Sequence, residues 1–179
     1  MEAALKVPQT ALEVYDMMPE RTRCEVIENV LYMSPAPTER HEWIRMEIAH
    51  AIFAYVKKNK LGKVYSPTPD VYFLDQQSAF VPDIAVILKE NYHLIKNGKI
   101  YGAPDIIVEV LSPDNKRDTV AKKNIYEQGG VKEYFVIDPT TRDTTCWLLL
   151  NGAFEEQYTE KVGFFKSTVL NIEFEFDYE

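Results

Sequence analysis

The chain has few cysteines and no long apolar run. Its 179 residues include only Cys24 and Cys146, which lie far apart, show no CxxC spacing and have no histidine nearby at zinc-ligand spacing. This pattern argues against a disulfide framework and against a zinc ribbon. No apolar run approaches the roughly 18 residues needed to span a bilayer, and the N-terminal MEAALKVPQT lacks the basic start and apolar stretch of a signal peptide. We therefore expect a cytoplasmic protein with no membrane segment.

Internal repeats, low-complexity tracts and linkers rich in Gly, Ser or Pro are also absent from the sequence. The hydrophobic content of 46% is enough to bury a core without covalent cross-links. Since nothing in the composition divides the chain, we expect one domain over residues 1–179.

Basic residues are outnumbered, and the formal net charge is -8. This balance argues against a nucleic-acid partner, because neutralising phosphates normally requires a basic surface. The excess of acidic residues is unevenly distributed along the chain. Residues 143–179 hold eight acidic and two basic side chains, so they contribute -6 to the net charge, and the rest of the chain contributes -2. Two basic clusters remain, and solvated helix ends explain such clusters more often than DNA contact does. They are Lys57, Lys58, Lys60 and Lys63, and Lys116, Arg117, Lys122 and Lys123.

Hydrophobic spacing and turn residues predict an alternation of helices and strands. Apolar residues at steps of three and four predict an amphipathic helix over 38–60, with Gly62 as its C-terminal stop. A second helix is expected over 118–128, before Gly129-Gly130, and a short one from Thr10 to near Pro19. Strands are expected at 24–33 with a turn at Glu28-Asn29, at 64–74, 80–88, 105–111 and 133–137, and at 144–158 with a turn at Asn151-Gly152. This order predicts an α/β fold with a central mixed sheet and a β-rich C-terminal extension.

Two carboxylates stand inside apolar strand patterns. Glu109 lies near the end of 105–111, a run that reads as a strand buried on both faces. A lone buried carboxylate costs several kcal/mol, so it must be paired, protonated or bound to a cation. Glu109 could equally reach solvent at the strand end. Asp83 repeats the situation beside Pro82 on the preceding strand, and for Asp83 alone an ordinary strand-end position is the more common explanation.

The two carboxylates together favour a metal site. Like charges on adjacent strands repel one another, and a hard divalent cation such as Mg²⁺ removes that penalty while using the oxygen ligands that it prefers. Bound Mg²⁺ can contact a phosphate oxygen and lower the pKa of an attacking water. We therefore predict a metal site at Asp83 and Glu109.

A catalytic lysine is missing from the place where a nuclease of the D...ExK type would carry it. Leu111 stands there, two residues after Glu109 and on the same face of the strand. On the helix 118–128, Lys122 flanks the core side while Lys123 points away, so Lys122 is the better candidate. Asp118 and Tyr126 lie one turn before and after Lys122, and a lysine paired only with Asp118 is the plain alternative.

His41 shares a helical stripe with Ile44 and Ile48, so it is expected to face inward, where it could contact a phosphate or the attacking water. A structural histidine near a helix start explains it equally well. His50 and His93 receive no role. Three glutamates could each approach the site, and the sequence does not choose among Glu25, Glu42 and Glu47.

Five segments in order resemble a known family: SPAPTERH at 34–41, VPD at 81–83, GAPDIIVEVLSP at 102–113, the helix with Asp118, Lys122 and Tyr126, and GGVKEYFVIDP at 129–139. From about residue 24 to 177 the chain resembles the Uma-type restriction endonucleases of the PD-(D/E)xK nuclease superfamily. The resemblance implies a restriction-endonuclease-like αβββαβ core in which Asp83, Glu109 and the Val110 carbonyl bind Mg²⁺. It also implies that Lys122 replaces the missing ExK lysine and that His41 belongs to the site.

The leading hypothesis is a Mg²⁺-dependent endonuclease, also able to use Mn²⁺, that hydrolyses DNA phosphodiester bonds with a metal-activated water. A homodimer is expected, because cutting both strands of a duplex benefits from two sites related by two-fold symmetry. The alternative is a domain that binds nucleic acid or a partner but does not cut. A third reading is an assembly protein whose acidic tail contacts a basic partner.

Overall fold

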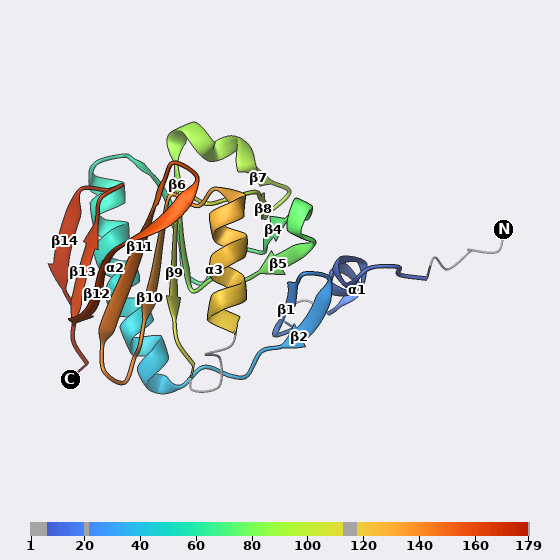
Figure 1. Cartoon of the computed structure of the whole chain (residues 1–179), viewed down its shortest axis with the longest axis horizontal. Helices are drawn as coiled ribbons and strands as arrows, with labels where there is room; N and C mark the ends of the chain where they lie inside the picture. The colour runs from blue at the N-terminus through green and yellow to red at the C-terminus, as the bar shows by residue number, and fades with distance from the viewer. Residues whose placement is uncertain (1–6, 20–21, 113–117, 179) are drawn as a thin grey trace.

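A six-stranded mixed sheet lies at the centre of the computed structural model, which describes residues 7–19, 22–112 and 118–178 (Figure 1). Its strands are, in spatial order, β12 (Ala153–Val162), β11 (Asp143–Leu150), β10 (Glu133–Ile137), β9 (Ile106–Val110), β6 (Ile84–Leu88) and β3 (Gly62–Tyr65). β9 and β10 run parallel, and the other neighbours pair antiparallel. The expected central mixed sheet is confirmed.

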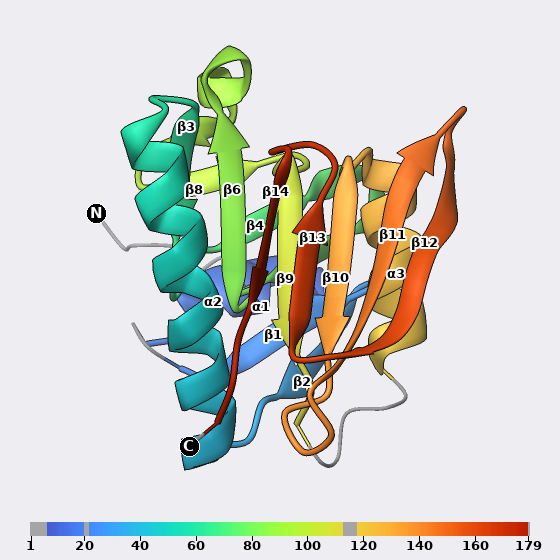
Figure 2. The ribbon, with the colours of Figure 1, turned by 90° about the vertical axis from the view of Figure 1, so that its left-hand side faces the viewer.

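Two long helices cover opposite faces of this sheet. α2 (Glu39–Lys58) packs on the face formed by Ile106 and Val108 of β9, and α3 (Asp118–Gly129) packs on the face formed by Ile107. Figure 2 shows α2 and α3 on the two sides of the sheet. Because side chains alternate along a strand, Glu109 shares the face of Ile107 and points toward α3.

A second six-stranded sheet lies on the α3 side. Its spatial order is β2 (Val30–Met33), β1 (Cys24–Ile27), β5 (Ser78–Phe80), β4 (Val71–Phe73), β8 (Lys99–Tyr101) and β7 (Ile95–Lys96). Phe73 and Phe80 of this sheet contact Tyr126 of α3, so the second sheet and α3 share one apolar cluster. The connections include α1 (Ala11–Met17) and the 3₁₀ helices η1 (Leu74–Gln76) and η2 (Lys89–Leu94).

The α2 side is completed by a hairpin of β13 (Phe164–Ser167) and β14 (Ile172–Glu175). Phe165 of β13 stacks on Phe135 of β10 with ring centroids 4.2 Å apart, which buries the hairpin against the central sheet. None of the helices in the described part of the chain has the length and apolar character needed to cross a membrane.

The predicted order αβββαβ is confirmed as α2, β3, β6, β9, α3 and β10, followed by the expected β-rich extension. Two predicted strands were wrong in extent. The run 64–74 is divided between β3 of the central sheet and β4 of the second sheet, and the run 80–88 is divided between β5 and β6. Each apolar run therefore serves two sheets, and the chain leaves one sheet for the other at 66–70 and at 81–83.

The predicted role of Gly62 as the stop of α2 was also wrong. α2 ends at Lys58, and Lys60 adopts the left-handed conformation with φ of 55°. Gly62 is the first residue of β3, and a Cβ added to it would lie 2.1 Å from the carbonyl oxygen of Ile87. Glycine is needed there because the backbone of β6 approaches closely.

Candidate metal and catalytic site

Asp83 lies where the chain passes from the second sheet into β6. The paired register of β6 and β9 ends at Ile84 and Val108, so β6 leaves the N–H group of Val110 without a strand partner. The carboxylate of Asp83 replaces that partner: its Oδ2 accepts a hydrogen bond from the Val110 N–H at 2.8 Å. This bond fixes Asp83 beside the end of β9, next to Glu109.

Glu109 is buried, with 9% of its surface exposed. Its Oε1 accepts a hydrogen bond from the Tyr126 hydroxyl at 2.7 Å and lies 3.5 Å from Nζ of Lys122. Burial raises the pKa of Glu109 to about 7; the charge of Lys122 opposes this rise, while Asp83 and Glu25 add to it. Near neutral pH this carboxyl group can therefore hold or release a proton.

Lys122 projects from α3 into the same cluster and is 8% exposed. Its Nζ lies 2.8 and 2.9 Å from the two carboxylate oxygens of Glu25 on β1, closer than its 3.5 Å distance from Glu109. Burial lowers the pKa of Lys122, but the charges of Glu109 and Glu25 outweigh that effect and raise it. Lys122 thus stays an ammonium group between two carboxylates. The sequence offered Asp118 as an alternative partner for Lys122, and the side chain of Asp118 lies outside the described part of the chain.

His41 faces inward from the first turn of α2, as its spacing predicted, and is 6% exposed. Its Nε2 lies 3.2 Å from Asp83 Oδ2. Burial lowers the pKa of His41, but the hydrogen bond and charge of Asp83, together with Glu42, raise it overall. Among the described residues, Nδ1 of His41 has no hydrogen-bond partner, although it lies 3.4 Å from Glu42 Oε1.

The three glutamates that the sequence left open are separated by the structure. Glu25 contacts Lys122, and Glu42 lies beside His41 and accepts from Arg45 at 2.5 Å. Glu47 is exposed on the outer side of α2. Arg45, which sequence reasoning missed, is 9% exposed and also contacts the Ser66 hydroxyl. Arg45 lies four residues, or about one helical turn, after His41, and this spacing could have indicated from the sequence that the two side chains share one face of the helix.

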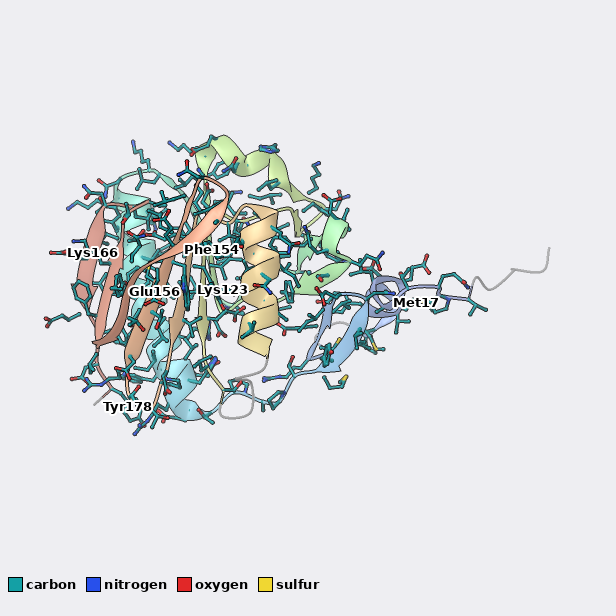
Figure 3. All side chains as sticks on the ribbon, in the orientation of Figure 1. Met17, Lys123, Phe154, Glu156, Lys166 and Tyr178 are labelled. Carbon is teal, nitrogen blue, oxygen red and sulfur yellow. The ribbon has the colours of Figure 1, made fainter. Side chains whose placement is uncertain are left out.

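The remaining candidates lie away from this cluster. Lys123, the alternative catalytic lysine, extends from α3 toward β11, with its Nζ 4.5 Å from the centre of the Trp147 ring (Figure 3). His50 is exposed on α2, and Nδ1 of the exposed His93 in η2 lies 3.3 Å from the Glu90 carbonyl oxygen. Lys116 and Arg117 lie outside the described residues.

One cavity of about 680 Å³ is lined by the residues predicted for the site. It lies between the N-terminal end of α2, the second sheet and the ends of β6 and β9. Its lining includes His41, Asp83, Glu109, Val110 and Lys122, together with Glu25, Glu42, Arg23 and Arg45. The structure therefore brings all five residues predicted for the site, from four separate segments, into one space large enough for a small organic ligand.

The donor set of the cavity fits a hard cation that keeps part of its water shell. In the described part of the chain, no three His, Cys, Asp or Glu side chains form a ready metal cage. Among the described residues, Asp83 Oδ1 and Glu109 Oε2 accept no hydrogen bond, so within this part of the chain one oxygen of each carboxylate has no protein donor. Mg²⁺ typically takes one or two carboxylates and retains several waters. The Val110 carbonyl, on the same strand side as its N–H, could add a third oxygen.

Comparison with known proteins identifies a family and a fold for this chain. A family model described as "Uma2: Putative restriction endonuclease" matches residues 10–177. A crystal structure titled as a putative nuclease belonging to DUF820, from Anabaena variabilis ATCC 29413, is similar to the chain with a TM-score of 0.73 and 24% sequence identity, and the match covers 92% of both chains. At this identity the likeness shows a shared fold. A search of curated proteins gives no match.

Proposed function

The chain belongs to the family described as "Uma2: Putative restriction endonuclease", and we propose that it is a metal-dependent endonuclease that hydrolyses DNA phosphodiester bonds with a metal-activated water. The observation that carries the proposal is the meeting of Asp83, Glu109 and Lys122 in one cavity, where one oxygen of each carboxylate has no donor among the described residues. Two carboxylates can hold a divalent ion, and an ammonium group fixed beside them can stabilise negative charge that develops on a phosphate oxygen.

Asp83 and Glu109, with the Val110 carbonyl, would hold Mg²⁺ or Mn²⁺. The ion, when bound, supplies a Lewis acid for a phosphate oxygen and lowers the pKa of an attacking water. The residues of this chain prepare that site before the ion arrives. The Val110 N–H orients Asp83, and the Tyr126 hydroxyl orients Glu109, so neither carboxylate has to be ordered during the reaction.

Lys122 provides positive charge that does not depend on pH in the neutral range, because its pKa is raised. An ammonium group in a buried site stabilises negative charge that develops on a phosphate oxygen more strongly than it would in water. Glu25 holds this ammonium at 2.8 Å, closer than its 3.5 Å distance from Glu109, and so fixes it beside the Glu109 carboxylate. We assign Glu25 as a positioning residue.

His41 serves the same reaction by positioning Asp83. Its Nε2 lies 3.2 Å from Asp83 Oδ2, so the ring helps to fix the carboxylate that would hold the ion. Its Nδ1 is buried without a hydrogen-bond partner among the described residues and lies 3.4 Å from Glu42 Oε1. The raised pKa of His41 favours the protonated ring, whose positive charge stabilises the Asp83 carboxylate.

Cleavage of plasmid and oligonucleotide DNA by the purified protein tests the proposal. Cleavage should require Mg²⁺ or Mn²⁺, stop with EDTA, and fall by at least about 100-fold in Asp83→Asn and Glu109→Gln. Glu47→Gln, which removes an exposed carboxylate with no contact to the cavity, is the matched control and should cut normally. Cleavage that survives in both site variants, with their fold intact by circular dichroism, would remove the proposed site.

One observation favours a second candidate function, a nucleic-acid- or partner-binding domain that does not cut. The carboxylates of Glu25 and Glu109 already have a counter-ion in Lys122, so part of the cluster is neutralised without a metal. Isothermal titration calorimetry separates the two functions. Binding of Mg²⁺ or Mn²⁺ that is lost in Glu109→Gln supports the nuclease, whereas DNA binding without metal binding supports the alternative.

A further inference from the structure

The lysine and arginine side chains that line the cavity differ in the partners they already have. Lys122 lies 2.8 Å from a carboxylate oxygen of Glu25, and Arg45 lies 2.5 Å from Glu42 Oε2. Arg23 lines the same cavity, yet its guanidinium forms no hydrogen bond or ion pair with any residue in the described part of the chain. Within that part, Arg23 is therefore the one lysine or arginine at the cavity whose charge is not already paired.

The strand β1 sets the direction of the Arg23 side chain. The Arg23 carbonyl oxygen accepts a hydrogen bond from the Ser34 N–H at 2.9 Å, which continues the pairing of β1 with β2 by one residue. Side chains alternate along an extended strand, so Arg23 projects to the same side as Glu25, with its Cα about 7 Å away. β1 lies on the α3 side of the central sheet (Figure 1), where Glu25 reaches Lys122. Arg23 is exposed and Glu25 is partly buried, so the guanidinium is open to solvent beside the site.

The charge of the cavity walls makes an unpaired arginine important for an anionic strand. Against its three lysine or arginine side chains, the cavity is lined by five acidic ones: Glu25, Glu42, Asp70, Asp83 and Glu109. A metal ion at Asp83 and Glu109 would offset this excess only where the scissile phosphate lies. Because Lys122 and Arg45 already neutralise carboxylates, a second phosphate of the strand needs another cation.

The chemistry of arginine suits that second phosphate. Its planar guanidinium can donate two parallel N–H bonds to phosphate oxygens, and it keeps its charge throughout the neutral range. Arg23 starts about 7 Å to one side of the glutamate that holds Lys122, so it lies beside the reaction centre and not within it. We propose that Arg23 binds the phosphate adjacent to the scissile one and so fixes where the DNA strand crosses the cavity. This inference rests on the proposed nuclease function and adds a substrate contact to it.

Replacing Arg23 should weaken DNA binding and leave the chemical step unchanged. Loss of one charged phosphate contact should raise the Kd for DNA about tenfold in Arg23→Ala. The slope of log affinity against log salt should become shallower by about 0.7 for a single strand or about 0.9 for a duplex. Arg23→Lys keeps the charge and loses the planar fork, so it should keep the wild-type slope with an intermediate Kd.

Fluorescence anisotropy of a labelled oligonucleotide, single-stranded and as a duplex, measures these values over a series of KCl concentrations. With Ca²⁺ in place of Mg²⁺, an ion with oxygen ligands is present and binding is measured without reliance on cleavage. Lys58→Ala is the matched control, because it removes an exposed positive charge about 25 Å along α2 from His41 and should bind DNA as the wild type does. In steady-state cleavage, Arg23→Ala should raise KM about tenfold and leave kcat within about twofold.

Four results would overturn the inference. They are a wild type that binds neither form of DNA, an Arg23→Ala variant with the wild-type Kd and salt slope, an equal loss in Arg23→Ala and Lys58→Ala, and a fall in kcat at unchanged KM, which would place Arg23 in the reaction centre. The nuclease proposal can fail separately. A chain that does not cut, but loses affinity and salt slope only in Arg23→Ala, would refute the nuclease and support Arg23 as a phosphate contact. A chain that cuts with the same KM in Arg23→Ala would support the nuclease and refute the contact.

Discussion

Replacing Glu109 by glutamine is expected to remove a pH dependence from the stability of the metal-free protein. The pKa of Glu109 is raised from 4.5, the value of a free glutamate, to about 7 by burial. Between these two values the folded protein keeps the proton that the unfolded chain releases. The folded state then binds more protons than the unfolded state, so stability falls as pH rises through this window and levels off above it.

The magnitude follows from the pKa change and the near-complete burial of the side chain, which is 9% exposed. At 1.36 kcal/mol per pH unit, the rise corresponds to ~3 kcal/mol of unfolding free energy lost between about pH 4.5 and pH 7. His41 adds a slope of the same sign at higher pH. Its pKa is raised above 6.5, so its contribution is present below that value and is lost as pH rises through its folded pKa.

Urea unfolding in EDTA, followed by tryptophan fluorescence, measures this effect at several pH values. The free energy of unfolding should fall by ~3 kcal/mol more in the wild type than in Glu109→Gln between about pH 4.5 and pH 7. Glu47→Gln serves as control, since its carboxylate is exposed. Equal slopes in the wild type and Glu109→Gln would refute the reasoning, because Glu109 would then ionise in the folded state as it does in the unfolded chain.

Three further changes test other contacts. Lys122→Met leaves the buried carboxylates of Glu25 and Glu109 without a counter-ion, and urea unfolding at neutral pH should show a loss of about 3–5 kcal/mol; a loss below about 1 kcal/mol would contradict the buried ion pair. Glu25→Gln removes a negative charge that raises the pKa of Glu109, so the pH range in which the free energy of unfolding falls should move to lower pH. An unchanged pH range would argue against electrostatic coupling between Glu25 and Glu109. Gly62→Ala would place a Cβ 2.1 Å from the Ile87 carbonyl oxygen, so thermal unfolding should reveal ~1–3 kcal/mol of destabilisation; an unchanged Tm would mean that β3 and β6 can separate at little cost.

Local patterns predicted the elements whose signals are contained in a few adjacent residues. Both expected hairpin turns form where Glu28-Asn29 and Asn151-Gly152 adopt positive φ, as two-residue turns require. The amphipathic helix that became α2 follows from the periodicity of its isoleucines. Such signals can be read in sequence because the backbone conformation depends mainly on neighbouring residues.

The division of strands between sheets could not be predicted in this way. The runs 64–74 and 80–88 each have strand character throughout, yet each contributes to both sheets. Strand propensity describes how a segment fits a pleated surface and does not say which surface. The interruption at 81–83 has a functional consequence, because it places Asp83 outside the ladder, where its carboxylate meets Val110.

Only part of the carboxylate site could be predicted from the sequence. Asp83, Glu109, Lys122 and His41 were predicted from charge on apolar strands, helical spacing and resemblance to a family, and the structure places them around one cavity. Glu25 could not be chosen, because its contact with Lys122 joins residues 97 positions apart.

By itself the sequence determined the long helices, the two hairpin turns and the order of the core elements, and it identified which charges are out of place among apolar neighbours. Only the tertiary structure decided that Glu25 of the second sheet holds Lys122 of α3 at 2.8 Å and that Glu109 receives the Tyr126 hydroxyl. The reason is physical. Periodicity and turn chemistry act over a few residues, whereas the energy of a buried carboxylate depends on which distant groups the packing of two sheets and a helix brings within reach of it.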